Sequence, residues 1–390
     1  MTDARWLDHV PEDWSVDPAW SVFIERGEKS SPGDVHLTPS QVFGVLAQDE
    51  YMARTGNRVV LNLAGQDNMK SVRTGDFIIH LRSFQGGIEY SSVDGKVSSA
   101  YTVLKPTRPM CAGYFAYLMK SKGFIGELAN LTFQLRDGQT VNYPRFSRMY
   151  LPVPPLLEQR AIADFLDREV GEIDAMVAKM DELTAVLSAR RLLTIASVLG
   201  SDDVCRPTPM FALASSEDHR RVPLKAEDRA KIPGPYPYFG ASGVIDSIDS
   251  FIWDDEVRVL VSEDGANLVA RRHPIAFLAR GQYWVNNHAH VLRPDQNVDG
   301  RLISYAIAIT NIQDAITGSA QPKLTAEALW RLKVPFPRNL SDSAKIADHL
   351  DEVTGRIDAM LAKVAELKTL LIERRAALIT DVVTGRKKVA

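Results

Sequence analysis

The 390-residue sequence has little cysteine and no long apolar run. Its two cysteines, Cys111 and Cys205, are too few for a disulfide framework or a four-cysteine zinc site, so we expect two thiols in a reducing cytoplasm. No apolar stretch reaches the roughly 18 residues that a membrane-spanning helix needs. The first residues contain neither a basic start nor an apolar segment, so we expect no signal peptide and no membrane contact.

The sequence also lacks the common motifs of catalysis. It contains no Gly-x-x-x-x-Gly-Lys-Ser/Thr, no Gly-x-Ser-x-Gly and no His-Glu-x-x-His, which argues against a P-loop ATPase, a serine hydrolase and a zinc protease. No Asn-Pro-Pro-Phe or Asp-Pro-Pro-Tyr element of an adenine methyltransferase occurs. His288 with His290, and Glu263 with Asp264, are weak metal-site candidates, because no cysteine or catalytic lysine lies close by. We therefore expect a chain with no catalytic residue and no metal site.

Charge is unevenly distributed along the chain, although the formal net charge is only −3. Residues 1–50 carry 3 basic and 10 acidic side chains, a net of −7, whereas residues 51–150 carry 13 basic and 6 acidic, a net of +7. The basic stretch is either a local phosphate-binding surface or the partner that neutralises the acidic stretch in the fold. The charges alone support both alternatives equally.

An internal repeat organises the chain. The segment Ala161-Ile-Ala-Asp-Phe-Leu-Asp167 recurs as Lys345-Ile-Ala-Asp-His-Leu-Asp351, an offset of 184 residues. The same offset aligns residues 173–176 with residues 357–360 without a gap. Such self-similarity is the signature of a duplicated structural unit.

Both copies have the apolar spacing of long coiled-coil helices. Residues that recur every seven positions form the predicted seam: Leu166, Ile173, Met180 and Leu187 in the first copy, and Leu350, Ile357, Val364 and Leu371 in the second. A second apolar row is interleaved with them: Met176, Leu183, Met360 and Leu367. Gly171 and Gly355 weaken each helix locally and are candidate sites of a bend. Gly200 and Gly385 follow the predicted ends, and about forty residues at roughly 1.5 Å each make a rod of roughly 60 Å.

A lone rod with such a seam is unstable in water, so the seam needs a partner. Three arrangements supply one. The two copies can pack on each other within one chain, each can support its own domain, or the rods can join two chains. The first arrangement is favoured because both copies belong to the same polypeptide.

The two remaining blocks are rich in short β-branched and aromatic runs broken by Gly, Pro, Asn and Asp. Runs such as Asp76–His80 and Val257–Val261 are typical of compact mixed-β domains. We therefore predict an α+β fold in four parts: a globular mixed-β domain at 1–150, a helix at 151–201, a second mixed-β domain at 202–337 and a helix at 338–390.

Several strings resemble the specificity subunits of type I restriction-modification enzymes. Residues 151–167 are similar to the start of that family's central helical region, and residues 373–385 are similar to its C-terminal region. In the globular blocks the similar strings are residues 75–78, 82–87, 90–92, 95–101, 236–243, 263–267, 286–290 and 318–324. The second helix departs from the family pattern at residues 341–343, where Ser341 or Asp342 is the candidate N-cap.

The resemblance implies two target recognition domains separated by two long antiparallel coiled-coil helices. Each domain would read one half of a bipartite site in double-stranded DNA, and the helices would fix the number of base pairs between the halves. The helices would also dock two methyltransferase subunits, through which the restriction and motor subunits join. The chain would hold no cofactor, because S-adenosylmethionine, ATP and magnesium belong to those partners.

The setting that the resemblance implies is DNA methylation and phage defence in a bacterial or archaeal cytoplasm. Three alternatives stay open: a non-catalytic coiled-coil scaffold, the specificity part of a related methylation system of type IIB-like or other phage-defence design, and a fused enzyme. The last is disfavoured by the missing motifs.

Contacts to DNA come mainly from Lys, Arg, Asn, Gln, Ser and Thr side chains and from backbone amides in glycine turns. The candidate DNA-binding residues of the first block are Lys70, Arg73, Arg82, Ser83, Gln85, Gly86, Gly87 and Lys96. Those of the second block are Ser242, Asn267, Arg271, Arg272, His288, His290, Gln321 and Lys323.

Overall fold

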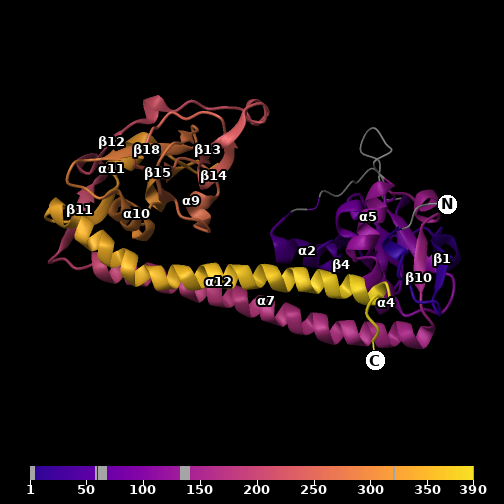
Figure 1. The fold of residues 1–390 in the computed structure, drawn as a ribbon. Coiled ribbons are helices and arrows are strands. Elements are labelled where there is room, and N and C mark those ends of the chain that lie inside the picture. The colour runs from indigo at the N-terminus through magenta and orange to yellow at the C-terminus, as the bar shows by residue number, and fades with distance from the viewer. Residues whose placement is uncertain (1–4, 58, 60–67, 132–140, 319–320, 390) are drawn as a thin grey trace. The chain divides into compact units, whose positions relative to one another are not determined.

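The computed structural model describes residues 5–57, 59, 68–131, 141–318 and 321–389, and the chain divides into two compact units (Figure 1). Unit 1 comprises Met1–Lys179 and Leu367–Ala390, and unit 2 comprises Met180–Glu366. Each unit therefore combines one globular block with part of both long helices. Within the described ranges, no helix is long and apolar enough to cross a membrane.

The repeated segments form two long helices, α7 over Leu156–Leu199 and α12 over Ser343–Val383. Both helices continue without interruption through Gly171 and Gly355, where an added Cβ would meet open space. The predicted stops are also present. Gly200 directly follows α7, and Gly385, with a φ of 75°, adopts the left-handed backbone that favours glycine just after a helix.

Of the two candidate N-caps of the second helix, Asp342 directly precedes the helix and Ser341 lies one residue further away. Ser341 and Asp342 lie in the short 3-10 helix η6 (Leu340–Asp342), which the Asn339 side chain caps by accepting a hydrogen bond from the Ser341 amide. Helix α12 begins one residue later at Ser343, whose hydroxyl accepts a hydrogen bond of 3.0 Å from the Asp299 amide. The start of the helix is therefore also tied to the globular part of unit 2.

In unit 1, α7 and α12 lie side by side and run antiparallel (Figure 1). The buried residues Ile162, Leu166 and Val170 of α7 share one core with Ile379, Val382 and Val383 of α12. Further along α7, Asp174 accepts hydrogen bonds of 2.8 and 3.3 Å from the Arg375 guanidinium. Numbers rise along α7 as they fall along α12, which defines the antiparallel sense.

In unit 2, the last part of α7 packs on the first part of α12 in the same sense. Leu187 forms a buried cluster with Ile357 and Val364. Arg191 of α7 donates hydrogen bonds of 2.6 and 3.2 Å to the Asp358 carboxylate of α12. Pairing of the two copies within one chain is therefore confirmed.

The predicted seam is covered, but the interleaved row is not. Six seam residues are buried and two, Met180 and Leu371, are half-buried; the six are Leu166, Ile173, Leu187, Leu350, Ile357 and Val364. The interleaved residues Met176, Leu183, Met360 and Leu367 are exposed. The contact between the helices instead combines the first row with residues four positions later, such as Val170 and Leu361, so the row three positions later lies outside it.

Unit 1 is built on a four-stranded antiparallel sheet in the order β2-β9-β6-β7, and β1 pairs with β10 beside it. Its strands are β1 Ser15–Pro18, β2 Phe23–Glu25, β3 Leu37–Ser40, β4 Gly44–Ala47, β5 Lys70–Val72, β6 Phe77–Ile79, β7 Glu89–Tyr90, β8 Gly95–Val97, β9 Thr102–Pro106 and β10 Tyr150–Val153. Its helices are η1 Arg5–Leu7, α1 Ala19–Val22, α2 Gln48–Thr55, α3 Ser83–Gly86, α4 Ala112–Leu118, α5 Lys122–Asn130 and α6 Tyr143–Phe146. Buried Phe23, Phe77 and Phe115 join the sheet to the core that α7 and α12 complete.

Unit 2 has a four-stranded antiparallel sheet in the order β12-β18-β15-β16, with β11 paired to β21. Its strands are β11 Cys205–Pro209, β12 Ala214–Ser216, β13 Pro233–Gly240, β14 Gly243–Ile248, β15 Arg258–Ser262, β16 Ala276–Ala279, β17 Trp284–Val285, β18 Ala289–Pro294, β19 Ile316–Thr317, β20 Lys323–Leu324 and β21 Lys333–Pro337. Besides η6, its helices are η3 Met210–Ala212, η4 Asp218–Arg220, α8 Ala226–Arg229, α9 Asn267–Ala270, α10 Gly300–Ile309, η5 Gln313–Ala315 and α11 Ala326–Arg331. Helix α10 packs on the sheet, and its buried residues join the core that Ile195 and Leu350 of the long helices complete.

The two units share one strand order. The sheet β2-β9-β6-β7 corresponds in chain order and pairing to β12-β18-β15-β16, and the pair β1–β10 corresponds to β11–β21. In each unit a hairpin follows the first strand of the sheet. It is β3–β4, between β2 and β6, in unit 1, and β13–β14, between β12 and β15, in unit 2. The duplication therefore extends from the long helices into the globular parts.

Candidate nucleic-acid interface

A single helical turn follows the same sheet strand in both units. In unit 1, β6 leads through residues 80–82 into α3, and in unit 2, β15 leads through residues 263–266 into α9. Eight candidate residues lie in these turns or within two residues of them: Arg82, Ser83, Gln85, Gly86, Gly87, Asn267, Arg271 and Arg272. Loops that a rigid sheet positions are common binding elements, so this is the region in which we expect DNA contacts.

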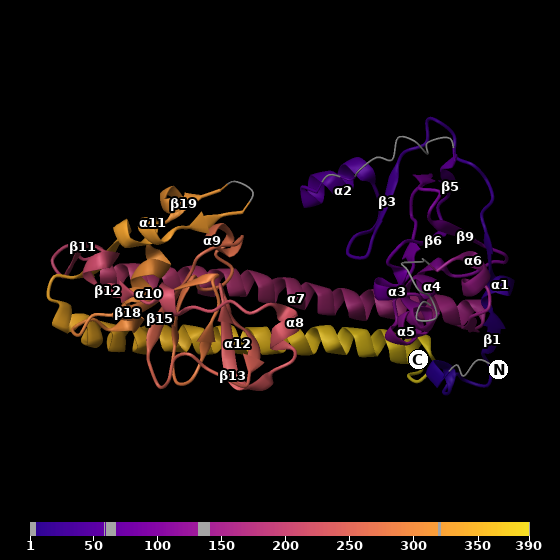
Figure 2. The ribbon, with the colours of Figure 1, turned by 90° about the horizontal axis from the view of Figure 1, so that it is seen from above.

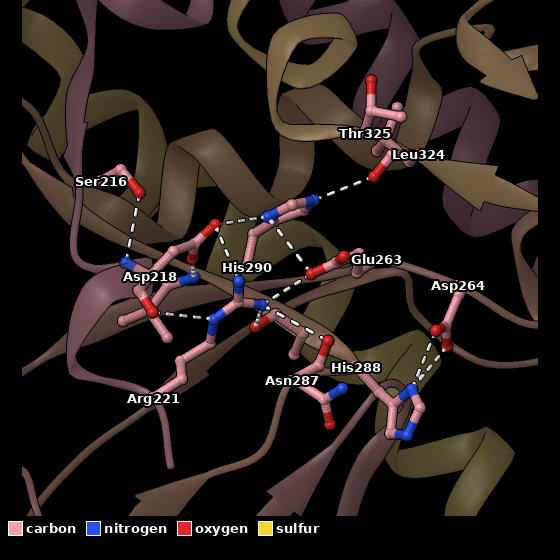
Figure 3. Close-up of polar contacts among 12 residues, drawn as sticks. Ser216, Asp218, Arg221, Glu263, Asp264, Asn287, His288, His290, Leu324 and Thr325 are labelled. Carbon is pink, nitrogen blue, oxygen red and sulfur yellow. Dashed lines mark hydrogen bonds and ion pairs between the residues drawn. The ribbon is translucent and has the colours of Figure 1, made fainter. Parts of the chain in front are cut away.

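Three of the family-like segments of the second block meet at one end of the unit 2 sheet. They are represented there by Glu263 and Asp264, by His288, and by Lys323 and Leu324. The Glu263 amide donates to the His288 carbonyl at 2.9 Å, and the Glu263 carbonyl accepts from the Leu324 amide at 2.7 Å. The Nδ1 atom of His288 lies 2.8 and 2.9 Å from the two carboxylate oxygens of Asp264 (Figure 3). Lys323 reaches Glu263 at 3.0 Å. His288 and Lys323 are therefore the exposed groups of a loop cluster that is held together by backbone and side-chain contacts.

A buried layer of charged groups supports this cluster (Figure 3). His290 is 2% exposed, and its two ring nitrogens lie 2.7 Å from an Asp218 carboxylate oxygen and 2.9 Å from the Leu324 carbonyl. Arg221 donates to Glu263 at 2.6 Å and to the Ala289 carbonyl at 2.9 Å. Both ring nitrogens of His290 therefore face oxygen atoms that accept hydrogen bonds.

The surroundings keep the half-buried carboxylates of Asp218 and Glu263 ionised. Burial acts to raise the pKa of Asp218, but hydrogen bonds from His290 and the Val291 amide outweigh it and hold that pKa below its usual value. Burial opposes ionisation of Glu263 as well, and hydrogen bonds from Arg221 and Lys323 lower its pKa overall. The acids therefore neutralise cations of the chain itself. Among the described residues, no group of three or more His, Cys, Asp or Glu side chains is placed to hold a metal ion.

Three candidates of unit 2 maintain the fold instead of facing solvent. His290 is buried, as described above. The Asn267 amide group bridges to the backbone of His273 with two hydrogen bonds of 3.0 Å. Arg271 donates to the Ala308 and Thr310 carbonyls at 3.0 and 2.8 Å, and burial lowers the pKa of its guanidinium. Buried His290 is therefore wrong as a DNA-contacting residue, whereas half-buried Asn267 and Arg271 stay predictions. The exposed candidates stay predictions: Ser242, Arg272, His288, Gln321 and Lys323.

Unit 1 requires a similar correction. Ser83 is buried and its hydroxyl accepts from the His80 amide at 2.8 Å, and Lys96 is buried with its ammonium on the Pro32 carbonyl, also at 2.8 Å. Half-buried Lys70 donates to the Tyr101 carbonyl at 2.7 Å. Gly87 is buried at a φ of 84°, where a side chain would strike the Met119 carbonyl. These four shape the fold. Exposed Arg73, Arg82 and Gln85 and half-buried Gly86 stay predictions.

The acidic and basic stretches of the first 150 residues pair with each other. The ion pairs that join them are Asp17–Arg108, Glu25–Lys70 at 3.0 Å and Glu28–Lys105 at 3.0 Å. Exposed pairs of this kind add little to stability, but they cancel charge locally. Neutralisation within the fold is therefore the better of the two alternatives that the sequence left open.

Sequence reasoning missed two sets of residues in this region. Asp218 and Arg221 organise the buried layer of unit 2, yet Asp218 lies 72 residues from His290 and no motif joins them. In unit 1 the tip of the β3–β4 hairpin, residues 41–43, was overlooked. Gly44 directly after Val42 and Phe43, between two short β-type runs, is a hairpin signal that the sequence does contain.

Residues 215–369 match the family model described as the type I restriction modification DNA specificity domain. A type I restriction enzyme specificity subunit from Haemophilus influenzae is 29% identical over 147 residues, which are 38% of this chain and 37% of that protein. The EcoKI specificity subunit of Escherichia coli is 27% identical over 92 residues, 23% of this chain and 19% of that protein. The alignments thus span well under half the length of the curated relatives.

The fold is similar to that of a solved structure from work on complex assembly and conformational transition of the type I R-M system. The TM-score is 0.66 at 14% identity, over 96% of this chain and 98% of that one. At this identity the likeness shows a shared fold. The specificity-domain match over residues 215–369 and the curated relatives make the chain similar to type I restriction-modification specificity subunits, and the solved structure shares its fold.

Proposed function

We propose that the chain is the subunit that selects the DNA sequence, with each unit reading one half of a bipartite site in double-stranded DNA. The observation that carries the proposal is the duplicated strand order, because two related globular parts in one chain suit two separate half-sites. The family also supports it, since the matched domain is named for DNA specificity.

The paired helices suit a spacer between half-sites. Helices of 44 and 41 residues have axes of roughly 60–66 Å at 1.5 Å per residue, and one turn of DNA is about 34–36 Å long. The number of base pairs between the half-sites then follows from helix length. The exposed apolar row on the same helices, which includes Met176 and Met360, supports docking of two methyltransferase subunits.

Chemistry in the assembly is then carried by other chains. Methyltransferase subunits supply S-adenosylmethionine-dependent methylation, and restriction subunits bound through them supply ATP- and magnesium-dependent cleavage. This chain contributes the choice of site and no catalytic residue or cofactor. Such a role places it in the bacterial or archaeal cytoplasm, where the DNA is.

Methylome sequencing of cells that carry this chain and its methyltransferase partner tests the proposal. We expect one bipartite motif with N6-methyladenine in each half, which disappears when the gene is deleted. A methylome that is unchanged by the deletion contradicts the proposal and favours a protein-binding scaffold. Methyl transfer to DNA by the purified chain alone would instead show a fused enzyme.

A further inference from the structure

The β3–β4 hairpin of unit 1 carries apolar side chains into solvent at its tip. Its strands pair from Leu37 with Ala47 to Ser40 with Gly44, and residues 41–43 form the connection. Val42 is 80% exposed and Phe43 is 41% exposed. Figure 2 shows β3 beside α2, the helix that follows the hairpin and contacts both of its strands. An exposed apolar tip on an ordered ribbon indicates a contact made with a partner.

The tip is fixed to the helical turn that we singled out as a DNA-contacting region. The Gln41 amide donates a 2.9 Å hydrogen bond to the Arg82 carbonyl, directly before α3. The Gln41 side chain also lies against Gly86, where an added Cβ would come within 2.7 Å of the Gln41 Cγ. Gly86 is therefore required for this close approach, and the hairpin tip and α3 form one surface.

The charge of this surface suits a nucleic acid. Arg82 is exposed, and no acidic residue within the described part of the chain forms an ion pair with it. A second cation lies at the tip, because the Arg54 guanidinium is 5.8 Å from the centre of the Phe43 ring and pairs with Glu50 at 2.5 Å. The exposed cation beside the apolar tip is thus left for an external phosphate or base.

Unit 2 repeats this arrangement at the corresponding place in the chain. Its β13–β14 hairpin also precedes the sheet strand that leads into a helical turn, and Val244 and Ile245 near its tip are more than half exposed. The strands of the two hairpins share no sequence pattern. A shared position with exposed apolar side chains in both units points to a shared role and not to a local packing defect.

Resting on the proposed function, we propose that the β3–β4 ribbon enters the DNA major groove, where Phe43 and Val42 contact thymine methyl groups and Arg82 contacts the adjacent backbone or a base edge. The major groove is about 12 Å wide and admits a two-stranded ribbon, whereas the minor groove, at about 6 Å, does not. Thymine is the base that presents a methyl group there, and aromatic side chains are among its usual contacts.

Uracil substitution tests this contact at the level of single atoms. The full-length chain, assembled with its methyltransferase subunits, is titrated with duplexes in which each thymine of the two half-sites is replaced in turn by uracil. We expect the wild-type complex to bind at least one uracil duplex about 3–10-fold more weakly, in one half-site only. The variant Phe43→Ala should bind the thymine duplex about 10-fold more weakly and lose the penalty for uracil at that position.

Trp20→Ala is the matched control, because Trp20 is an aromatic residue of unit 1 that is 59% exposed and lies in α1, outside the hairpin. Thermal melting of all variants should be unchanged, since none of these side chains is buried. A uracil penalty that persists in Phe43→Ala, or unchanged affinity of that variant, overturns the inference while leaving the proposed function intact. A wild-type complex with no sequence preference on any duplex refutes the proposed function itself.

Discussion

Units 1 and 2 share a strand order, yet different charged groups hold the loops that follow the equivalent strands β6 and β15. In unit 1, Lys120 pairs with Glu89 and donates to the Gly86 carbonyl of α3 at 3.0 Å. In unit 2, the corresponding region contains the network of Asp218, Arg221, Glu263 and His290. The same strand order is thus compatible with different sets of polar contacts. Loop surfaces can change with the DNA target while the sheet and the long helices stay constant.

Removing one member of the buried network of unit 2 should produce the largest difference in stability between the two units. In Asp218→Ala, the His290 ring and the Val291 amide both lose the carboxylate that they contact, and leaving two such polar groups unpaired costs about 3–5 kcal/mol. We expect hydrogen exchange by mass spectrometry to show unit 2 opening while unit 1 stays protected. The control is Asp264→Ala, which breaks only the contact to exposed His288 and should cost less than about 1 kcal/mol. Equal loss of protection in both units would show that they fold as one.

A charge in the helix seam should be nearly as disruptive. Ile357→Asp places a carboxylate in the buried cluster with Leu187 and Val364, at a cost of about 2–4 kcal/mol. Met360→Asp, one turn away on the exposed row, is the matched control for the fold. Ile173→Asp makes the same change in unit 1. We expect both seam variants to lower the melting temperature and to disturb the half-site spacing of the methylation motif. Assembly with unchanged spacing in both would contradict the spacer role.

Long helices and short strands differ in what their sequences reveal. Seven-residue steps such as Leu166, Ile173 and Met180 sustain a pattern over some forty residues, so the helices and their pairing could be predicted. The strands span two to eight residues and share no motif between units, so the common strand order could not. The network of Asp218 with His290 depends on contacts across 72 residues, for which no local spacing exists. Candidate residues chosen by type alone therefore included buried Ser83, Lys96 and His290.

Low pH should lower the stability of unit 2, by an intermediate amount. Hydrogen bonds from Arg258 and Trp253 lower the pKa of Glu217 in unit 2 to about 2, against the opposing effect of burial. The pKa of Asp218 and that of Glu263 are also lowered. A depressed folded-state pKa stabilises the fold above the unfolded value near 4.5, and this stabilisation disappears as pH falls toward 2.

We therefore expect the urea midpoint of unit 2, followed by site-resolved hydrogen exchange, to fall between pH 4.5 and pH 2. Glu217→Gln should be less stable at neutral pH and should show a flatter dependence over this range. A midpoint for unit 2 that is independent of pH in that window would contradict the electrostatic role of these carboxylates.

The smallest effect should come from the exposed arginines, and it tests whether the units read DNA independently. Arg82 precedes the α3 turn of unit 1, and Arg272 follows the α9 turn of unit 2. Arg82→Ala should weaken binding by about 3–10-fold, because one phosphate or base contact is lost. Binding selections from pools with one half-site randomised should show the change on one half only, and Arg272→Ala should alter the other half. If Arg82 contacts a phosphate, affinity falls equally for all sequences and the salt dependence decreases; if it contacts a base, one position becomes degenerate. Equal losses at both halves from either variant would mean that the duplicated strand order serves one composite site, and the comparison between two separate readers would fail.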